Sequence, residues 1–121
     1  MLSATETPLF DPVAVDRLRA VAGDEDLTFV AEMAHLFVEE STKSLRDLQA
    51  ACDKGDWRAV SRLSHSLKSA SATFGLMRLS NALVALELNT KDGTSDSQTA
   101  ALATSVHDEF ERSLPVVKEL A

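Results

Sequence analysis

The chain has 121 residues, 45% of them hydrophobic and 26% charged, which is the balance of one compact globular domain rather than of a disordered chain. Its net charge of −7 and its pI near 4.8 argue against nucleic acid as a partner, because phosphate backbones attract basic surfaces. The single cysteine excludes an intramolecular disulfide, and no signal peptide or membrane-spanning run is evident, so we expect a cytoplasmic protein that does not bind a membrane.

The first part of the chain predicts a tail and a short leader helix. Residues 1–10 show no helical pattern and are expected to be a flexible N-terminal tail, ahead of a single helical domain over residues 11–121. Asp11 as N-cap and Pro12 at the first helical position start the leader helix, and Gly23 ends it.

A long second helix is predicted over roughly residues 26–53, because apolar side chains recur at three-and-four spacing from Phe29 to Cys52. Asp24 or Asp26 can cap its start.

Two further helices follow a stop-and-start signal, in which Gly55 ends one helix and Asp56 caps the next. We expect a third helix over about 57–73, ended by Phe74-Gly75, and a fourth over about 76–89 that is marked by regularly spaced leucines.

The last helix is expected to begin near Asp96, after a polar loop, and Pro115 is expected to kink or break it. No segment has the alternating pattern of a strand. The sequence therefore predicts an all-α fold, an antiparallel four-helix bundle with a short N-terminal leader helix.

His65 lies on the polar face of the predicted third helix. On a helical wheel it points about 180° away from the apolar stripe, which consists of Val60, Leu63, Leu67, Ala70 and Phe74. Its neighbours along the helix include two cations and several small residues, namely Ser61, Arg62, Lys68, Ser69 and Ala72. A lone surface histidine is usually only solvated, so the combination with these neighbours is what suggests a site.

The stretch "HSLKSASATFG", from His65 to Gly75, resembles the signature of histidine-containing phosphotransfer (HPt) domains. In that signature an apolar residue, a lysine, a small residue and a glycine follow the histidine at fixed spacing, places that are filled here by Leu67, Lys68, Ser69 and Gly75. The lead-in that includes "GDEDLTF" and "KGDW" is also similar, so the resemblance covers roughly residues 10–115. Ser69 departs from the family's frequent glycine, although serine is still small.

The resemblance implies a phosphorelay intermediate. His65 would accept a phosphoryl group from the aspartate of a response-regulator receiver domain and pass it to another receiver, and a hybrid histidine kinase is a further implied partner. Lys68 would offset the charge of the phosphoryl group, with Arg62 as a weaker candidate. Ser61, Arg62, Ser69 and Ala72 would form the docking face, and Gly75 is the structural glycine of the motif. The chain shows no nucleotide-binding motif, so we expect a phosphoryl carrier rather than an enzyme, without a cofactor.

Two other interpretations stay open. A metal- or haem-binding bundle is disfavoured because His35, His65 and His107 are scattered and no Glu-x-x-His pair projects from two core faces. A helical adaptor or dimerisation module, which binds receiver-like partners without transfer, is disfavoured because His65 and Lys68 are both present. Since the predicted bundle is complete within one chain, we expect a monomer.

Overall fold

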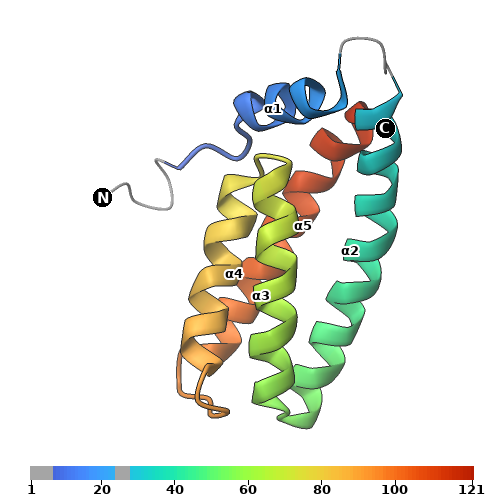
Figure 1. Cartoon of the computed structure of the whole chain (residues 1–121). Helices are drawn as coiled ribbons and strands as arrows, with labels where there is room; N and C mark the ends of the chain where they lie inside the picture. Colours follow the sequence, from blue (N-terminus) through green and yellow to red (C-terminus); the bar gives the residue numbers. More distant parts are fainter. Residues whose placement is uncertain (1–6, 24–27) are drawn as a thin grey trace.

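The computed structural model describes residues 7–23 and 28–121, and these two ranges form five α-helices (Figure 1). In chain order the helices are α1 (Pro12–Ala22), α2 (Phe29–Lys54), α3 (Trp57–Thr73), α4 (Met77–Thr90) and α5 (Thr99–Leu120). Helices α2 to α5 run alternately up and down as a bundle, and α1 lies across one end, where it packs on α2 and α3. The predicted fold class is confirmed.

Local signals in the sequence set several of the helix ends. The Asp11 carboxylate accepts a hydrogen bond from the Val13 N–H at 3.0 Å and caps α1. Gly55 adopts the left-handed conformation that ends α2, with φ of 68°. Asp56 then caps α3 by accepting from the Ala59 N–H at 3.2 Å, so α2 and α3 turn sharply into an antiparallel pair.

Leucines of α4 form the centre of the core. Leu76, which precedes the helix, and Leu79, Leu83 and Leu86 within it are all fully buried. Val106 and Val117 of α5 are also fully buried, which places one apolar stripe from each helix in the interior. The bundle thus holds α3 on a rigid support.

Helices α3 and α4 make the most extensive contacts of any helix pair in the described residues. Some small side chains of the two helices are buried, since Ser64 and Ser71 of α3 are fully buried and Ser80 of α4 is nearly so and donates from its hydroxyl to the Lys68 carbonyl at 3.4 Å. Small side chains allow two helices to pack at short range. The close pairing of α3 and α4 brings polar residues of the two helices together at the bundle surface.

Pro115 was expected to kink or break the last helix. The prediction of a break is wrong, because α5 continues through Pro115 to Leu120. Proline has no N–H to donate to the carbonyl of Glu111, one turn earlier. Both residues are exposed, so water can hydrate the unpaired carbonyl, while Val117 packs in the core and keeps the chain helical.

The segment before α1 makes hydrogen bonds to the helical domain. Residues 1–6 lie outside the described residues, but residues 7–10 are held against the turn between α3 and α4. Arg78 donates from Nε to the Thr7 carbonyl at 2.7 Å, and the Met77 N–H donates to the Leu9 carbonyl at 3.1 Å. Residues 7–10 thus contact the helical domain, and the flexibility of the tail stays a prediction.

The remaining differences concern helix starts. The described part of α2 begins at Phe29, and the expected caps Asp24 and Asp26 lie outside the described residues. Helix α5 begins at Thr99 rather than near Asp96, because Asp96 closes the preceding turn by accepting from the Gln98 N–H at 2.8 Å. No helix in the described ranges combines the length and apolar character needed to cross a membrane.

Candidate functional site

His65 lies near the middle of α3, and its side chain is 62% exposed. The predicted orientation toward solvent is confirmed. On the opposite side of α3, Val60, Leu67 and Phe74 are buried in the core and Leu63 is partly buried. The ring is therefore presented by a helix whose other face is anchored.

Glu87 of α4 contacts both polar residues that the sequence placed at this site. Its Oε2 lies 2.6 Å from Nδ1 of His65, and its Oε1 accepts a hydrogen bond from Nζ of Lys68 at 2.5 Å. Glu87 is only 17% exposed and Lys68 is 27% exposed, so the carboxylate sits behind the imidazole rather than in open water. The candidate site is thus a His65–Glu87–Lys68 cluster that joins two helices.

The charge state of Glu87 follows from these contacts. The hydrogen bond from Lys68 lowers the pKa of the Glu87 carboxyl below its ordinary value of 4.5, and the hydrogen bond from His65 and the positive charges add to the effect. Partial burial opposes this shift without reversing it. The carboxylate is ionised at neutral pH and pairs with the Lys68 ammonium.

Glu87 was not among the site residues predicted from the sequence. It lies 22 residues from His65 along the chain, so no motif connects the two. One signal was present, since Glu87 is the only acidic residue within Met77–Thr90, a segment that is otherwise mostly apolar. A lone carboxylate in such a helix is expected to have a partner.

The residues predicted as a docking face differ in their exposure. Arg62, Ser69 and Ala72 are exposed on α3, in the same helix as His65. Ser61 is half-buried, and its hydroxyl donates to the Glu87 carbonyl at 3.3 Å, so it joins α3 to α4.

Gly75 lies at the turn after α3, with φ of 73°. Its carbonyl accepts from the Asp11 N–H at 2.8 Å, which fastens the start of α1 to the end of the helix that carries His65. The structural role expected for Gly75 agrees with this geometry.

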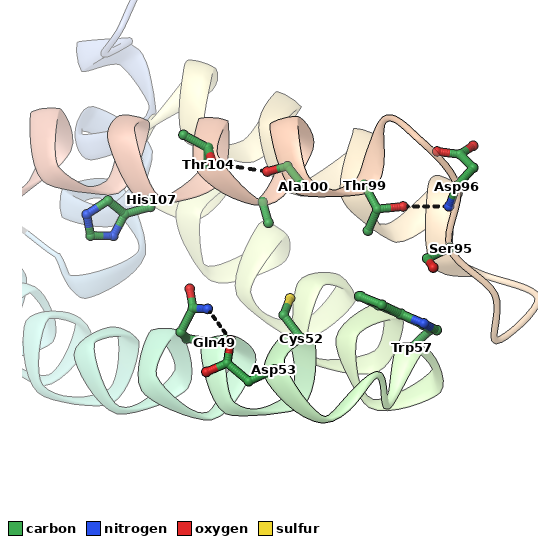
Figure 2. Close-up of a pocket in the computed structure, with 11 residues that line it drawn as sticks. Gln49, Cys52, Asp53, Trp57, Ser95, Asp96, Thr99, Ala100, Thr104 and His107 are labelled. Atoms are coloured by element: carbon green, nitrogen blue, oxygen red, sulfur yellow. Dashed lines mark hydrogen bonds between the residues drawn. The ribbon is translucent and has the colours of Figure 1, made fainter.

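The other two histidines are exposed and lie elsewhere. His35 pairs with Glu39 on α2 at 3.1 Å, and His107 on α5 lines a groove of about 590 Å³ between α2 and α5 (Figure 2). Burial raises the pKa of the Cys52 thiol in this groove, so the thiol is protonated at neutral pH. Among the described residues, no three His, Cys, Asp or Glu side chains are grouped closely enough to hold a metal ion.

The groove in Figure 2 lies across the bundle from His65. It is lined mainly by α2 and α5, whereas His65 and its partners lie on α3 and α4, and each of these pairs forms one side of the bundle. Hydrogen bonds from Gln49 to Asp53 and from Thr104 to the Ala100 carbonyl show that polar groups in the groove are already paired. The groove is thus separate from the candidate site around His65.

Together, the antiparallel bundle and the exposed, carboxylate-backed imidazole define a helical protein that presents one histidine on its surface. The family model of the Hpt domain matches residues 32–114, which is most of the chain, and the chain belongs to the Hpt domain family.

Two relatives support this assignment. The chain is 26% identical over 115 residues to Multistep phosphorelay regulator 1 of Schizosaccharomyces pombe, covering 92% of this chain and 38% of that protein. The chain thus spans well under half the length of this relative. It also resembles the crystal structure of histidine-containing phosphotransfer protein B (HptB) from Pseudomonas aeruginosa PAO1, with a TM-score of 0.80, 28% identity and 93% coverage of each chain.

Proposed function

We propose that the chain is a phosphorelay intermediate in which His65 carries the phosphoryl group. The observation that carries the proposal is the exposed imidazole, which is oriented by Glu87 and lies beside Lys68 on a chain of the Hpt domain family. A phosphorelay regulator and a histidine-containing phosphotransfer protein among its relatives support the same role.

In the proposed step a ring nitrogen of His65 attacks the phosphorus of an aspartyl phosphate on a receiver domain. The new N–P bond forms as the O–P bond breaks, and the aspartate leaves as a carboxylate. Transfer to a second receiver reverses these events. The phosphoryl group brings a charge of about −1.5 to −2, which the neighbouring Lys68 ammonium offsets. The receiver supplies most of the catalytic groups, so the chain acts as a carrier rather than as an enzyme.

The proposed docking surface for the receiver is the exposed part of α3 around His65, with Arg62, Ser69 and Ala72. An apolar groove of about 320 Å³ between α2 and α3 continues this surface from Ser66, which adjoins His65. Leu36 in this groove is 47% exposed and adds an apolar side chain to the proposed docking surface. Partners would be response-regulator receiver domains or a hybrid histidine kinase. We further propose that the chain is a cytoplasmic monomer.

The experiment is transfer from a receiver domain that has been labelled with radioactive phosphate. The wild-type chain is expected to take up the label, which should be labile to acid and stable to alkali, as a phosphoramidate is. His65→Gln is expected to abolish uptake while changing the free energy of unfolding by no more than about 1 kcal/mol, because the ring is mostly exposed.

His35→Gln is the matched control, because His35 is also exposed and also pairs with a glutamate. It should take up label at the wild-type rate. Retained uptake by His65→Gln would refute the assignment of the site. A chain that binds the phosphorylated receiver but never takes label would support the adaptor alternative instead.

A further inference from the structure

A long groove runs between α2 and α5, away from His65. The depression of about 590 Å³ in Figure 2 continues into a second one of about 290 Å³. Both depressions are lined by Gln49, Cys52, Ala103 and His107. Together they extend from Thr42 to Asp53 on α2 and from Thr99 to Glu111 on α5. At the rise of an α-helix each wall is about 16–18 Å long, which is the length of about three helical turns.

We propose that this groove is a docking site for a helix of another protein, about three turns long, with one apolar face and basic residues on both flanks. The length and the apolar floor of the groove fit a helix, and the charges on its rim select a basic one. The proposal does not rest on the phosphorelay role of His65.

The two helices that form the walls are the longest of the bundle but contact each other least. Helix α2 has 26 residues and α5 has 22, yet their contact is the least extensive among the neighbouring pairs of α2 to α5 in the described residues. The α5 wall carries small side chains, namely Ala100, Ala103 and Thr104. Small side chains allow the backbone of a further helix to pack at short range.

The floor of the groove is apolar and incompletely covered. Leu45, Cys52, Trp57 and Ala103 pack against the core but are only partly buried. Figure 2 shows Trp57 at one end of the larger depression and the Cys52 sulfur directed from α2 toward α5. Partly exposed apolar side chains between two helices are the surface that recognition of an amphipathic helix uses.

The charged residues on the rim are mostly acidic. Asp53 and Asp96 line the larger depression and Glu111 lines the smaller one. Arg46 is the only lysine or arginine among the described residues that line the groove. Glu111 forms an ion pair with none of the described residues, so its charge can interact with a partner. Since Asp53 belongs to α2 and Glu111 to α5, a bound helix meets one carboxylate on each flank.

This charge distribution decides which occupant fits. Two copies of a chain with a net charge of −7 would bring two acidic rims together, and the like charges would repel. Basic residues on the flanks of a helix would instead be attracted by Asp53 on one wall and Glu111 on the other. Because His65 and its partners lie on α3 and α4, a helix bound in the groove leaves the imidazole exposed.

The first test identifies the charge of the partner without assuming its sequence. A display library of helical peptides of about 14 residues is selected on the full chain. The apolar face of each peptide is varied among leucine, phenylalanine and alanine, and the flanks among lysine, glutamate and glutamine. We expect the enriched peptides to carry lysine on both flanks. Enrichment of glutamate or glutamine there, or no enrichment at all, would overturn the proposal.

Ala100→Phe and Ala101→Phe are a matched pair that locates the binding site. Both alanines are exposed on α5, so neither change disturbs the core, but Ala100 lines the groove and Ala101 is not among its described lining residues. Ala100→Phe should lower the affinity for a selected peptide at least about 10-fold, and Ala101→Phe should leave it unchanged. Equal affinities would place the peptide elsewhere. Self-association of the wild-type chain in light scattering that Ala100→Phe abolishes would assign the groove to a second copy, against the proposal.

Trp57 and the histidines report where a selected peptide binds. Trp57 is the single tryptophan and lines the groove, so its fluorescence should shift to shorter wavelength as the peptide covers it. In NMR spectra the ring signals of His107, which also lines the groove, should move, while those of His35 and His65 should stay. Movement of the His65 signals in place of those of His107 would refute docking in the groove.

Neutral replacements of the rim acids measure what the charges contribute. Asp53→Asn keeps an acceptor for the hydrogen bond from Gln49, and Glu111→Gln keeps the length of the side chain. The double variant should bind a lysine-flanked peptide about 5-fold more weakly. Asp47→Asn combined with Asp108→Asn is the matched control, because it removes one exposed acid from each helix outside the groove lining, and it should bind as the wild type does. Equal losses in the two double variants would show that net charge rather than the rim attracts the peptide, and would overturn the proposal.

Discussion

Replacement of Gly75 by alanine tests how the end of α3 is fastened to α1. Gly75 has φ of 73°, and a Cβ atom added to it would lie 2.2 Å from the Asp11 carbonyl oxygen and 3.0 Å from Cβ of Ala14. A left-handed conformation costs a non-glycine residue about 1–2 kcal/mol. The obstructing oxygen belongs to the backbone, so relief requires α1 to move, and overpacking of this kind costs about 1–3 kcal/mol.

Movement of α1 would also strain two hydrogen bonds, from the Asp11 N–H to the Gly75 carbonyl and from the Met77 N–H to the Leu9 carbonyl. Each is worth about 0.5–1.5 kcal/mol. These costs are not fully additive, because a movement of α1 that relieves the overpacking is the same movement that strains the hydrogen bonds. We therefore expect Gly75→Ala to lower the free energy of unfolding by about 3–5 kcal/mol. Urea denaturation followed by circular dichroism measures this quantity.

Gly55→Ala is the matched control. Gly55 has φ of 68°, but an added Cβ would meet only Nε1 of Trp57, at 3.8 Å. The Gly55→Ala variant should therefore lose only the conformational cost, about 1–2 kcal/mol of its free energy of unfolding. Equal losses in the two variants would show that the contact between Gly75 and Asp11 does not constrain the fold, and would refute the reasoning.

Three further predictions follow from the same structure. Lys68→Ala should slow phosphoryl transfer to His65 while the chain stays folded by circular dichroism, and a wild-type rate would show that Lys68 is a bystander. Pro115→Ala should raise the free energy of unfolding by about 1–3 kcal/mol, because α5 is already continuous and would regain a hydrogen bond; a destabilised variant in urea titration would contradict this. The stabilising effect of Glu87 should be present above its ordinary pKa of 4.5 and disappear as the pH falls through its lower folded value. The difference in urea midpoint between wild type and Glu87→Gln should therefore shrink between pH 6 and pH 3, and a constant difference would be evidence against the ion pair.

Local patterns were sufficient for the helices and for the exposure of His65. The Gly55-Asp56 signal placed the turn between α2 and α3, and the spacing of apolar residues in α3 placed the ring toward solvent. Both depend on interactions within a few residues of one another, which the helical period and capping chemistry determine.

Patterns were insufficient where a distant segment competes with a local preference. Pro115 breaks the helical hydrogen-bond series by its own chemistry, yet the buried Val117 beyond it keeps α5 in place. Residues 7–10 show no helical pattern, but Met77 and Arg78 donate hydrogen bonds to their carbonyls. In both cases tertiary contacts outweigh the local signal.

What the sequence determined by itself is a set of amphipathic helices and one helix face that carries His65 and Lys68, since both are consequences of residue spacing along a single helix. Only the tertiary structure decided that Glu87 lies behind them. Its position depends on the relative register of α3 and α4, which the packing of the two helices determines, and packing of that kind has no signature in the spacing of either helix alone.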